Sequence, residues 1–321
     1  MNRPLRSMPE SFILKSPPEG HDYSFRALGT ACTLHLCSGS QVQADMAAAL
    51  AIAEIERIEK KFSRYDESSI LSAINRAGAI GGKVTVDEET AALLDFAFAC
   101  YEKSGGLFDI TAGVLRQAWN FASGSLPEPD AVNALLPLIG MDKIVWRSPS
   151  LSFVVAGMEL DFGGIGKEYA VDRLASLLAA EGFNRGLVNL GGDLLALGPR
   201  ADGEPWKIGL RDPLNSAEMA GEVAIERGAL ATSGDYERCI RSNGRRYSHI
   251  LNPTTGWPVE GLASVSVLAG RCMVAGSAAT IAMLKGESGA QWLAEMGVPH
   301  HWVDNTGWRG GNLPTVWTCE V

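Results

Sequence analysis

Residues 238–260 read RCIRSNGRRYSHILNPTTGWPVE and place one histidine, His249, between two turn-forming segments, SNG and NPTTG. Just upstream, residues 231–236 (ATSGDY) end an apolar run in small and polar side chains. A rigid loop of such residues can aim a hydroxyl or a carboxylate at a ligand. Together the two stretches predict the floor of a catalytic site rather than a part of the hydrophobic core.

The overall composition is that of a globular protein with a sizeable core. The chain has 321 residues, of which 46% are hydrophobic, and it carries a net charge of −9 with a pI near 5.2. This acidic balance argues against nucleic acid or an anionic membrane as the main partner, because both demand a basic face. A phosphate-bearing ligand would therefore need locally placed donors or a metal ion.

The ends and the cysteines predict the domain plan and the location. Residues 1–22 contain only a short apolar stretch among prolines, so we interpret them as a flexible N-terminal arm without a signal segment or membrane span. Residues 23–321 are then expected to form a single domain. The six cysteines lack the paired spacing of a zinc site or a disulfide framework. We therefore predict reduced thiols and a cytoplasmic protein.

Apolar residues at helical spacing predict helices over 45–62 and 168–180, and a third over 88–103 that stops at Gly105. Within the first helix, Leu50, Ile55, Ile58 and Phe62 are expected to share one face. Strand-like runs are short and clustered, at 33–36, 144–146, 152–155, 187–190, 206–210, 221–225, 248–251 and 263–268. This order lacks steady strand–helix alternation, which favours an α+β layer architecture over a doubly wound parallel sheet.

Three glycine-rich turns are candidate ligand sites. Residues 160–167 (LDFGGIGK) lead into a helix, where N–H groups and Lys167 would favour an anion, although the turn could be only a tight connection. Residues 188–193 (VNLGGD) end a strand in a carboxylate, or form a simple hairpin turn. In residues 104–111 (SGGLFDIT), Asp109 and Thr111 could contact a ligand or cap a helix.

In their joint order these segments resemble the ApbE-type flavin transferase family, the FAD:protein FMN transferases. The resemblance covers about residues 24–290, at 28–30 (LGT), 62–65 (FSRY) with Ser69 and Asn75, 105–111, 161–172, 189–193, 232–236, 247–256 and 275–286. It implies an ApbE-like, T-fold-like arrangement of mixed or antiparallel sheets with helices packed on them. It also implies that FAD is cleaved with the help of Mg²⁺. FMN would then be attached through a phosphoester to a Ser or Thr of a target flavoprotein, and AMP would leave.

Matching the motifs residue by residue gives the flavin contacts that the resemblance implies. Leu28 and Tyr65 would line the isoalloxazine pocket, although Tyr65 could instead be a core aromatic. Asp109, Ile110 and Thr111 would contact the flavin or its ribityl chain.

The same matching implies the catalytic residues. Lys167 would face the pyrophosphate, unless it is only a solvated lysine at a helix start. His249 would activate the acceptor hydroxyl, because imidazole titrates near neutral pH, and it is expected on the strand before Asn252. Asp235 would position FAD or the histidine.

The implied metal site departs from the family pattern. A carbonyl of the turn ending at Gly166 and the hydroxyl of Thr280 would bind Mg²⁺, but Gly276 stands where the family has an aspartate. Glu168 stands where the family usually has a glycine after the lysine. We hypothesise that Glu168 replaces the missing carboxylate. The alternative is that it only favours the helix N-terminus electrostatically.

Three functions are compatible with this sequence. The first is the FMN transferase, and the second is an FAD pyrophosphatase, in which water replaces the acceptor hydroxyl and FMN and AMP are released. The third is a non-catalytic flavin-binding protein that lost its metal together with the aspartate at position 276. Lys167, His249 and Thr280 favour an enzyme, because a binding protein would not need them.

Overall fold

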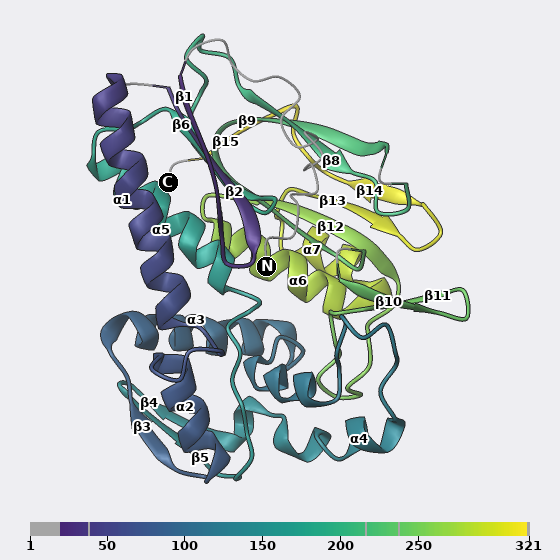
Figure 1. Ribbon diagram of the computed structural model, residues 1–321. Coiled ribbons are helices and arrows are strands. Elements are labelled where there is room, and N and C mark those ends of the chain that lie inside the picture. The colour runs from purple at the N-terminus through teal and green to yellow at the C-terminus, as the bar shows by residue number, and fades with distance from the viewer. Residues whose placement is uncertain (1–19, 38, 216, 237, 320–321) are drawn as a thin grey trace.

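A ten-stranded sheet and a smaller helical lobe make up the molecule, which we describe from a computed structural model (Figure 1). The structure describes residues 20–37, 39–215, 217–236 and 238–319. Most of the predicted N-terminal arm, residues 1–19, lies outside this part of the chain. The first strand begins at His21, so its first two residues fall within the predicted arm.

The large sheet has the strand order β1-β2-β6-β7-β9-β12-β13-β14, and β8 and β15 also pair with β9. Every pairing is antiparallel except that of β15 with β9. The strands are β1 (His21–Ala27), β2 (Thr30–Leu36), β6 (Gly186–Leu190), β7 (Asp193–Gly198), β8 (Trp206–Arg211), β9 (Met219–Gly234), β12 (Leu262–Ala269), β13 (His300–Asp304), β14 (Arg309–Gly311) and β15 (Val316–Thr318). The predicted α+β architecture is confirmed.

Strand β9 is much longer than the sequence pattern predicted. It has 16 residues, whereas a strand was expected only at 221–225 and a loop at 231–236. Its first half pairs with β8 and β15 and its second half with β7 and β12. Gly228, with φ of +114°, joins the two halves where polar residues interrupt the apolar pattern. Thr232 and Ser233 are therefore held in the sheet, and Asp235 follows it directly.

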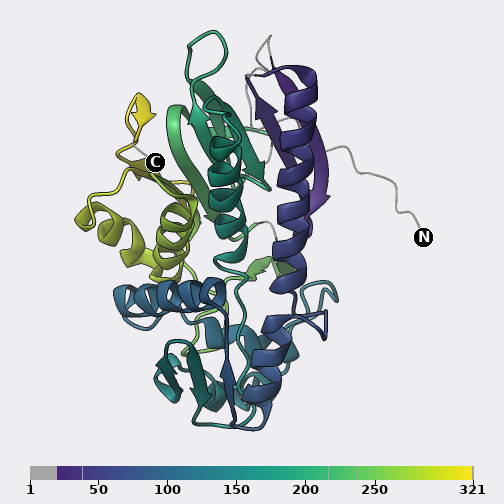
Figure 2. The ribbon, with the colours of Figure 1, turned by 90° about the vertical axis from the view of Figure 1, so that its left-hand side faces the viewer.

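Three long helices lie side by side over one face of the sheet (Figure 2). They are α1 (Gln41–Lys61), α5 (Gly166–Ala180) and α6 (Cys272–Leu284), and α7 (Gly289–Glu295) packs against α6. Four alanines, Ile55 and Ile58 form the buried stripe of α1, so the prediction that Leu50 shares this face was wrong. Leu50 is 46% exposed. A second core, around the fully buried Trp206, covers the opposite face of the sheet.

The smaller lobe lies between α1 and α5 in the chain. Its helices are α2 (Ile70–Ala79), α3 (Glu88–Ser104) and α4 (Pro129–Asn133), with the 3-10 helices η1 (Ile110–Gln117), η2 (Leu136–Leu138) and η3 (Met141–Lys143). Its strands are β3 (Lys83–Thr85), β4 (Ile144–Arg147) and β5 (Ser150–Phe153). A further 3-10 helix, η4 (Gly286–Ser288), lies outside this lobe and follows α6. Asp87 caps the start of α3, and Gly105, with φ of +71°, ends the helix as predicted.

A hairpin of β10 (Cys239–Ser242) and β11 (Arg245–Ser248) projects from the main body (Figure 1). The predicted strand at 248–251 was wrong, because the ladder ends at Ser248 and His249 follows it. The Ser248 hydroxyl accepts a hydrogen bond from the N–H of Ile250 (2.9 Å), which turns the chain at this point.

No disulfide joins cysteines in the described part of the chain, and Cys32, Cys100 and Cys272 are buried. In the described part of the chain, none of the helices combines the length and the apolar character that a bilayer crossing requires.

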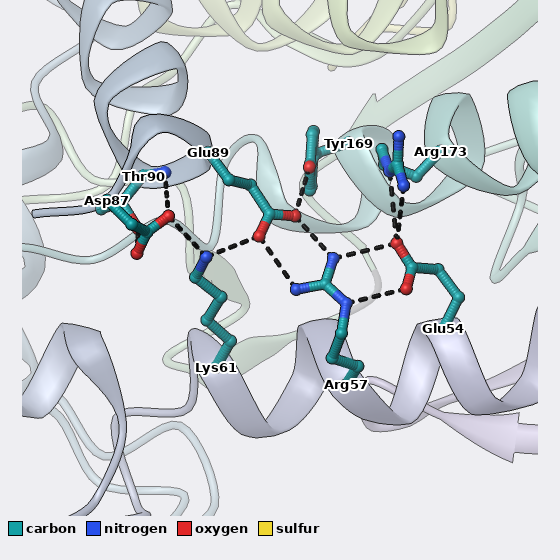
Figure 3. A network of polar contacts seen from close by, with 8 residues as sticks. All are labelled: Glu54, Arg57, Lys61, Asp87, Glu89, Thr90, Tyr169 and Arg173. Atoms are coloured by element: carbon teal, nitrogen blue, oxygen red, sulfur yellow. Dashed lines mark hydrogen bonds and ion pairs between the residues drawn. The ribbon is translucent and has the colours of Figure 1, made fainter.

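A network of charged side chains joins α1, α3 and α5 (Figure 3). The Glu89 carboxylate accepts hydrogen bonds from Arg57 (2.6 and 2.9 Å), Lys61 (2.6 Å) and the hydroxyl of Tyr169 (2.5 Å). Arg57 also donates to Glu54 (2.7 and 2.9 Å). Since Tyr169 lies in the first turn of α5, the network fixes the start of that helix relative to α1 and α3.

Replacing Glu89 should expose the contribution of this network to stability. Its partners, Arg57 first, lower the pKa of Glu89 from 4.5 to about 2. The stabilisation is therefore complete above pH 4.5 and is lost as the pH falls through about 2. We expect Glu89→Gln to lower the free energy of unfolding at neutral pH by about 1–2 kcal/mol, allowing for solvent screening.

Urea denaturation between pH 3 and 7 measures this effect. Glu88→Gln, an exposed position on the same helical turn, is the matched control and should match the wild type. An equal loss of stability in both variants would contradict a specific role for Glu89.

Candidate active site

A close backbone approach brings the turn at 189–193 against the segment at 28–30. Gly191 has φ of +69°, and a Cβ there would lie 2.4 Å from the Thr30 hydroxyl. The N–H of Gly191 donates to the carbonyl of Ala31 (3.0 Å). The N–H of Gly192 donates to Asn189 Oδ1 (2.9 Å). Two of the predicted motifs therefore meet at the ends of β2 and β6.

An ion pair joins the next two motifs. The Lys167 ammonium, at the start of α5, contacts the Asp193 carboxylate, which opens β7 and is only 2% exposed. Asp193 also accepts a hydrogen bond from the N–H of Thr232 (3.4 Å). Lys167 was predicted to face the pyrophosphate, and the structure pairs it with Asp193, the carboxylate that ends the candidate turn at 188–193. The carboxylate directly after a double glycine was the available signal.

Glu168 is a buried carboxylate. The residue is 6% exposed, and its Oε2 atom has no hydrogen-bond partner. Burial, followed by the negative charge of Asp193, raises the pKa of Glu168 above its usual range. A Cβ built on Gly276 would lie 2.5 Å from Glu168 Cγ and 2.8 Å from Oε1. The Glu168 side chain therefore fills the space that any side chain at position 276 would need.

Thr280 lies one helical turn after Gly276, on the same face of α6. Its hydroxyl is 2.8 Å from that of Ser233 at the end of β9. In the described residues no three His, Cys, Asp or Glu side chains gather as metal ligands. The oxygen atoms of Glu168, Thr280 and the Gly166 carbonyl nevertheless suit Mg²⁺, which prefers oxygen ligands and usually keeps several waters. The unpartnered oxygen of Glu168 is the observation that fits such an ion.

His249 lies at the base of the β10–β11 hairpin and remains accessible to solvent. Its Nδ1 is 3.2 Å from the carbonyl oxygen of Arg238. Although its side chain is exposed at one edge, the surrounding protein partly desolvates the ring, and this desolvation, followed by the charge of Arg238, lowers the pKa of His249 to about 4. The imidazole is therefore neutral at physiological pH and able to accept a proton.

Asp235 forms an ion pair with Arg246 on β11, with Nη2–Oδ1 and Nε–Oδ2 distances of 2.7 and 3.0 Å. Asp235 was predicted to position FAD or His249, and its partner Arg246 was not predicted. Four arginines occur in the hairpin segment, so the sequence alone gave no signal for choosing among them. The pair ties the end of β9 to the strand that precedes His249.

The residues predicted to line the flavin pocket differ in exposure. Tyr65 is 83% exposed, so the alternative that it is a core aromatic was wrong. The Arg64 guanidinium lies 5.2 Å from the centroid of the Tyr65 ring and also forms an ion pair with Asp161. Leu28 takes a left-handed backbone, with φ of +52°, and is partly buried against the core.

Asp109 and Thr111 form the cap of η1, which was the alternative that the sequence left open. Asp109 Oδ1 accepts hydrogen bonds from the N–H and the hydroxyl of Thr111 (2.8 and 2.6 Å), and Oδ2 accepts one from Met141 (3.2 Å). Thr111 is fully buried, and Ile110 is 5% exposed. A flavin contact from these three residues stays a prediction, and only Asp109 keeps a partly exposed side chain.

A pocket opens beside Asp193, between the turn after β6, the strand β8 and the end of β9. Its lining residues are Gly191, Gly192, Ile208, Gly209, Leu210, Arg211, Leu230, Thr232 and Tyr236. The hollow has a volume of only about 20 Å³, which is room for about one water molecule, so in this form it does not accommodate a flavin.

The fold and the site define an α+β protein whose glycine turns and helix starts gather around buried carboxylates. The model of the ApbE family matches residues 28–301, and the chain belongs to this family. A FAD:protein FMN transferase of Treponema pallidum is 32% identical over 280 residues, covering 81% of this chain and 77% of that protein. One of Vibrio cholerae is 31% identical over 75% of this chain and 74% of its own length.

Solved structures agree with this assignment. The ApbE protein of Thermotoga maritima is 30% identical and superposes with a TM-score of 0.84, covering 92% of this chain and 97% of its own. The flavin transferase ApbE of Vibrio cholerae is 26% identical, with a TM-score of 0.81 and the same coverage. The ApbE-like architecture predicted from the sequence is therefore confirmed.

The approach of Gly191 to Thr30 can be tested with two alanine variants. In Gly191→Ala both the left-handed backbone and the overlap with Thr30 should cost free energy, about 2–4 kcal/mol in total. Gly182→Ala is the matched control, since Gly182 has φ of +87° but nothing within 4 Å of its Cβ position. It should cost only the conformational part, about 1 kcal/mol. Equal losses in urea denaturation would contradict a steric requirement at Gly191.

Proposed function

We propose that this protein is a metal-dependent FAD:protein FMN transferase that modifies a Ser or Thr of a target flavoprotein. The observation that carries the proposal is the direct contact between separate motifs around Lys167, Asp193, Ser233 and Thr280. The names of the relatives, which align over most of the chain, support the same activity.

The reaction exchanges a phosphoanhydride bond of FAD for a phosphoester bond to the acceptor. The acceptor hydroxyl oxygen attacks the phosphorus of the FMN half of FAD, and the bond from that phosphorus to the bridging oxygen of the pyrophosphate breaks. AMP departs with that oxygen, and the hydroxyl proton must leave the attacking oxygen. A divalent cation such as Mg²⁺, when bound, would neutralise charge that builds on the pyrophosphate.

His249 is the proposed base for that proton. Its neutral imidazole is open to solvent and to an incoming protein segment, and its Nδ1 faces the carbonyl of Arg238. That carbonyl favours a proton on Nδ1 and leaves Nε2 to accept the proton of the acceptor hydroxyl. Asp235 supports the base indirectly. Its ion pair with Arg246 fixes strand β11 of the hairpin, and His249 directly follows that strand.

Lys167 is the proposed donor to the pyrophosphate. It stands at the N-terminus of α5, where the helix dipole favours an anion. Its pairing with Asp193 holds the ammonium in place and orders the side chain before substrate arrives. Leu28 and the exposed ring of Tyr65 are proposed to cover the flavin, with Asp109, Ile110 and Thr111 shaping the adjoining loop.

The alternatives differ in their products. An FAD pyrophosphatase would pass the phosphoryl group to water, and a flavin-binding protein would release no AMP. The combination of a neutral histidine with an ordered lysine favours catalysis over binding alone.

Product analysis with full-length protein, FAD, Mg²⁺ and a candidate acceptor flavoprotein tests the proposal. We expect AMP release together with covalent FMN on the acceptor, detected by in-gel fluorescence and mass spectrometry. Lys167→Met should reduce AMP release by a factor on the order of 100 or more. Lys207→Met, at an exposed position on β8, should leave it unchanged. Release of AMP with only free FMN would show that the protein is an FAD pyrophosphatase and not a transferase. Tight FAD binding without AMP release would show that it is not an enzyme acting on FAD.

The pH dependence tests the role of His249. Because desolvation lowers its pKa to about 4, the active neutral form predominates above about pH 5. The value of kcat/KM should therefore be flat from about pH 5.5 to 8, and His249→Gln should lower it by a factor on the order of 100–10,000. His21→Gln on β1 is the control and should behave like the wild type. If kcat/KM fell at low pH with a midpoint near 6.5 in the wild type only, His249 would have an unperturbed pKa. That result would contradict the lowered pKa described above.

A further inference from the structure

Three buried carboxylates surround the starts of α5 and α6. Glu168, Asp172 and Asp193 are 6%, 8% and 2% exposed. Asp193 pairs with Lys167, and Asp172 accepts hydrogen bonds from the N–H groups of Cys272 (2.7 Å) and Met273 (3.0 Å) at the start of α6. Glu168 has no such partner for its Oε2 atom. The charge balance therefore requires either a cation or a proton at Glu168.

The position of Glu168 is matched to a glycine on the neighbouring helix. A Cβ on Gly276 would lie 2.5 Å from Glu168 Cγ, 2.8 Å from Oε1 and 3.0 Å from the carboxyl carbon. The Glu168 carboxylate thus lies beside the place that a side chain at position 276 would take, against the same face of α6. Thr280 follows one turn later on the same face of α6, so its hydroxyl lies on the same side of the helix.

Electrostatic support of the α5 N-terminus does not account for this arrangement. A carboxylate in the first turn serves that purpose best while it remains solvated, and burial costs several kcal/mol. Glu168 is only 6% exposed. Its side chain fills the space beside Gly276, so position 276 has no room for a side chain of its own.

We propose that Glu168 is the carboxylate ligand of a divalent cation, supplied from α5 in place of a residue on α6. The Thr280 hydroxyl and the Gly166 carbonyl supply further oxygen atoms, and waters or substrate phosphates complete the shell. The inference rests on the metal dependence contained in the proposed function.

Direct metal binding tests this assignment without reference to turnover. Full-length protein is titrated with Mn²⁺, followed by EPR of the free ion, and Mg²⁺ is then added in competition. Glu168→Gln keeps the shape of the side chain and removes the charge, and it should weaken Mn²⁺ binding by a factor on the order of 10–100. Glu181→Gln, at the exposed far end of α5, is the matched control and should bind like the wild type.

Two outcomes would overturn the proposal. One is unchanged Mn²⁺ affinity in Glu168→Gln, and the other is a wild type that binds no Mn²⁺ at millimolar concentration, which would mean that a proton balances the charge. AMP release, measured on the same samples, separates this inference from the proposed function. Active Glu168→Gln with unchanged Mn²⁺ affinity refutes the ligand alone, whereas Glu168-dependent Mn²⁺ binding without AMP release refutes the enzyme alone.

A transposition of the carboxylate provides an independent test. Gly276→Asp alone should lower both Tm and Mn²⁺ affinity, since its side chain overlaps Glu168. The double variant Glu168→Ala/Gly276→Asp relieves the overlap and should bind Mn²⁺ within a few-fold of the wild type. Circular dichroism verifies folding of each variant. A folded double variant that binds as weakly as Glu168→Gln would contradict the exchange of ligands.

Discussion

The ion pair between Lys167 and Asp193 is the contact on which the arrangement of the site depends. It joins the first turn of α5 to the first residue of β7, and the same carboxylate accepts a hydrogen bond from β9 at Thr232. A carboxylate buried to this extent would cost several kcal/mol without a cation beside it, so helix and strands must keep their relative positions. Two glycines allow the elements of the site to pack this closely. The missing side chain of Gly191 leaves room for Thr30, and that of Gly276 leaves room for Glu168.

Much of the fold could be predicted from the sequence where the local signals were strong. The helix that starts after Asp87 and stops at Gly105 was predicted because its cap and its stop are encoded within one segment. The length of β9 was not, because its middle residues are polar and only pairing with four other strands makes them extended. The buried stripe of α1 was also misjudged at Leu50. Small alanines, rather than large residues, mark the face of that helix that packs on the sheet.

The site residues could be predicted in kind, while their pairings could not. The order of the motifs led to Lys167, His249 and Asp235, since each stands beside a turn or a helix start. The partners Asp193 and Arg246 come from other elements, and no local pattern connects residues that meet only after folding. Burial was equally hidden. An acidic residue at a helix start is usually solvated, and the space above Gly276 that makes Glu168 an exception belongs to another helix.

Strands β2 and β6 are neighbours in the sheet, yet residues 37–185 separate them in the chain. Bringing such distant segments together closes a loop of roughly 150 residues, at an entropic cost of about 4 kcal/mol before any contact compensates for it. Long-range pairings of this kind slow folding. We therefore expect the junction at which Gly191 meets Thr30 to form late in folding. A chain that has not yet closed this loop would have no complete place to hold its substrate.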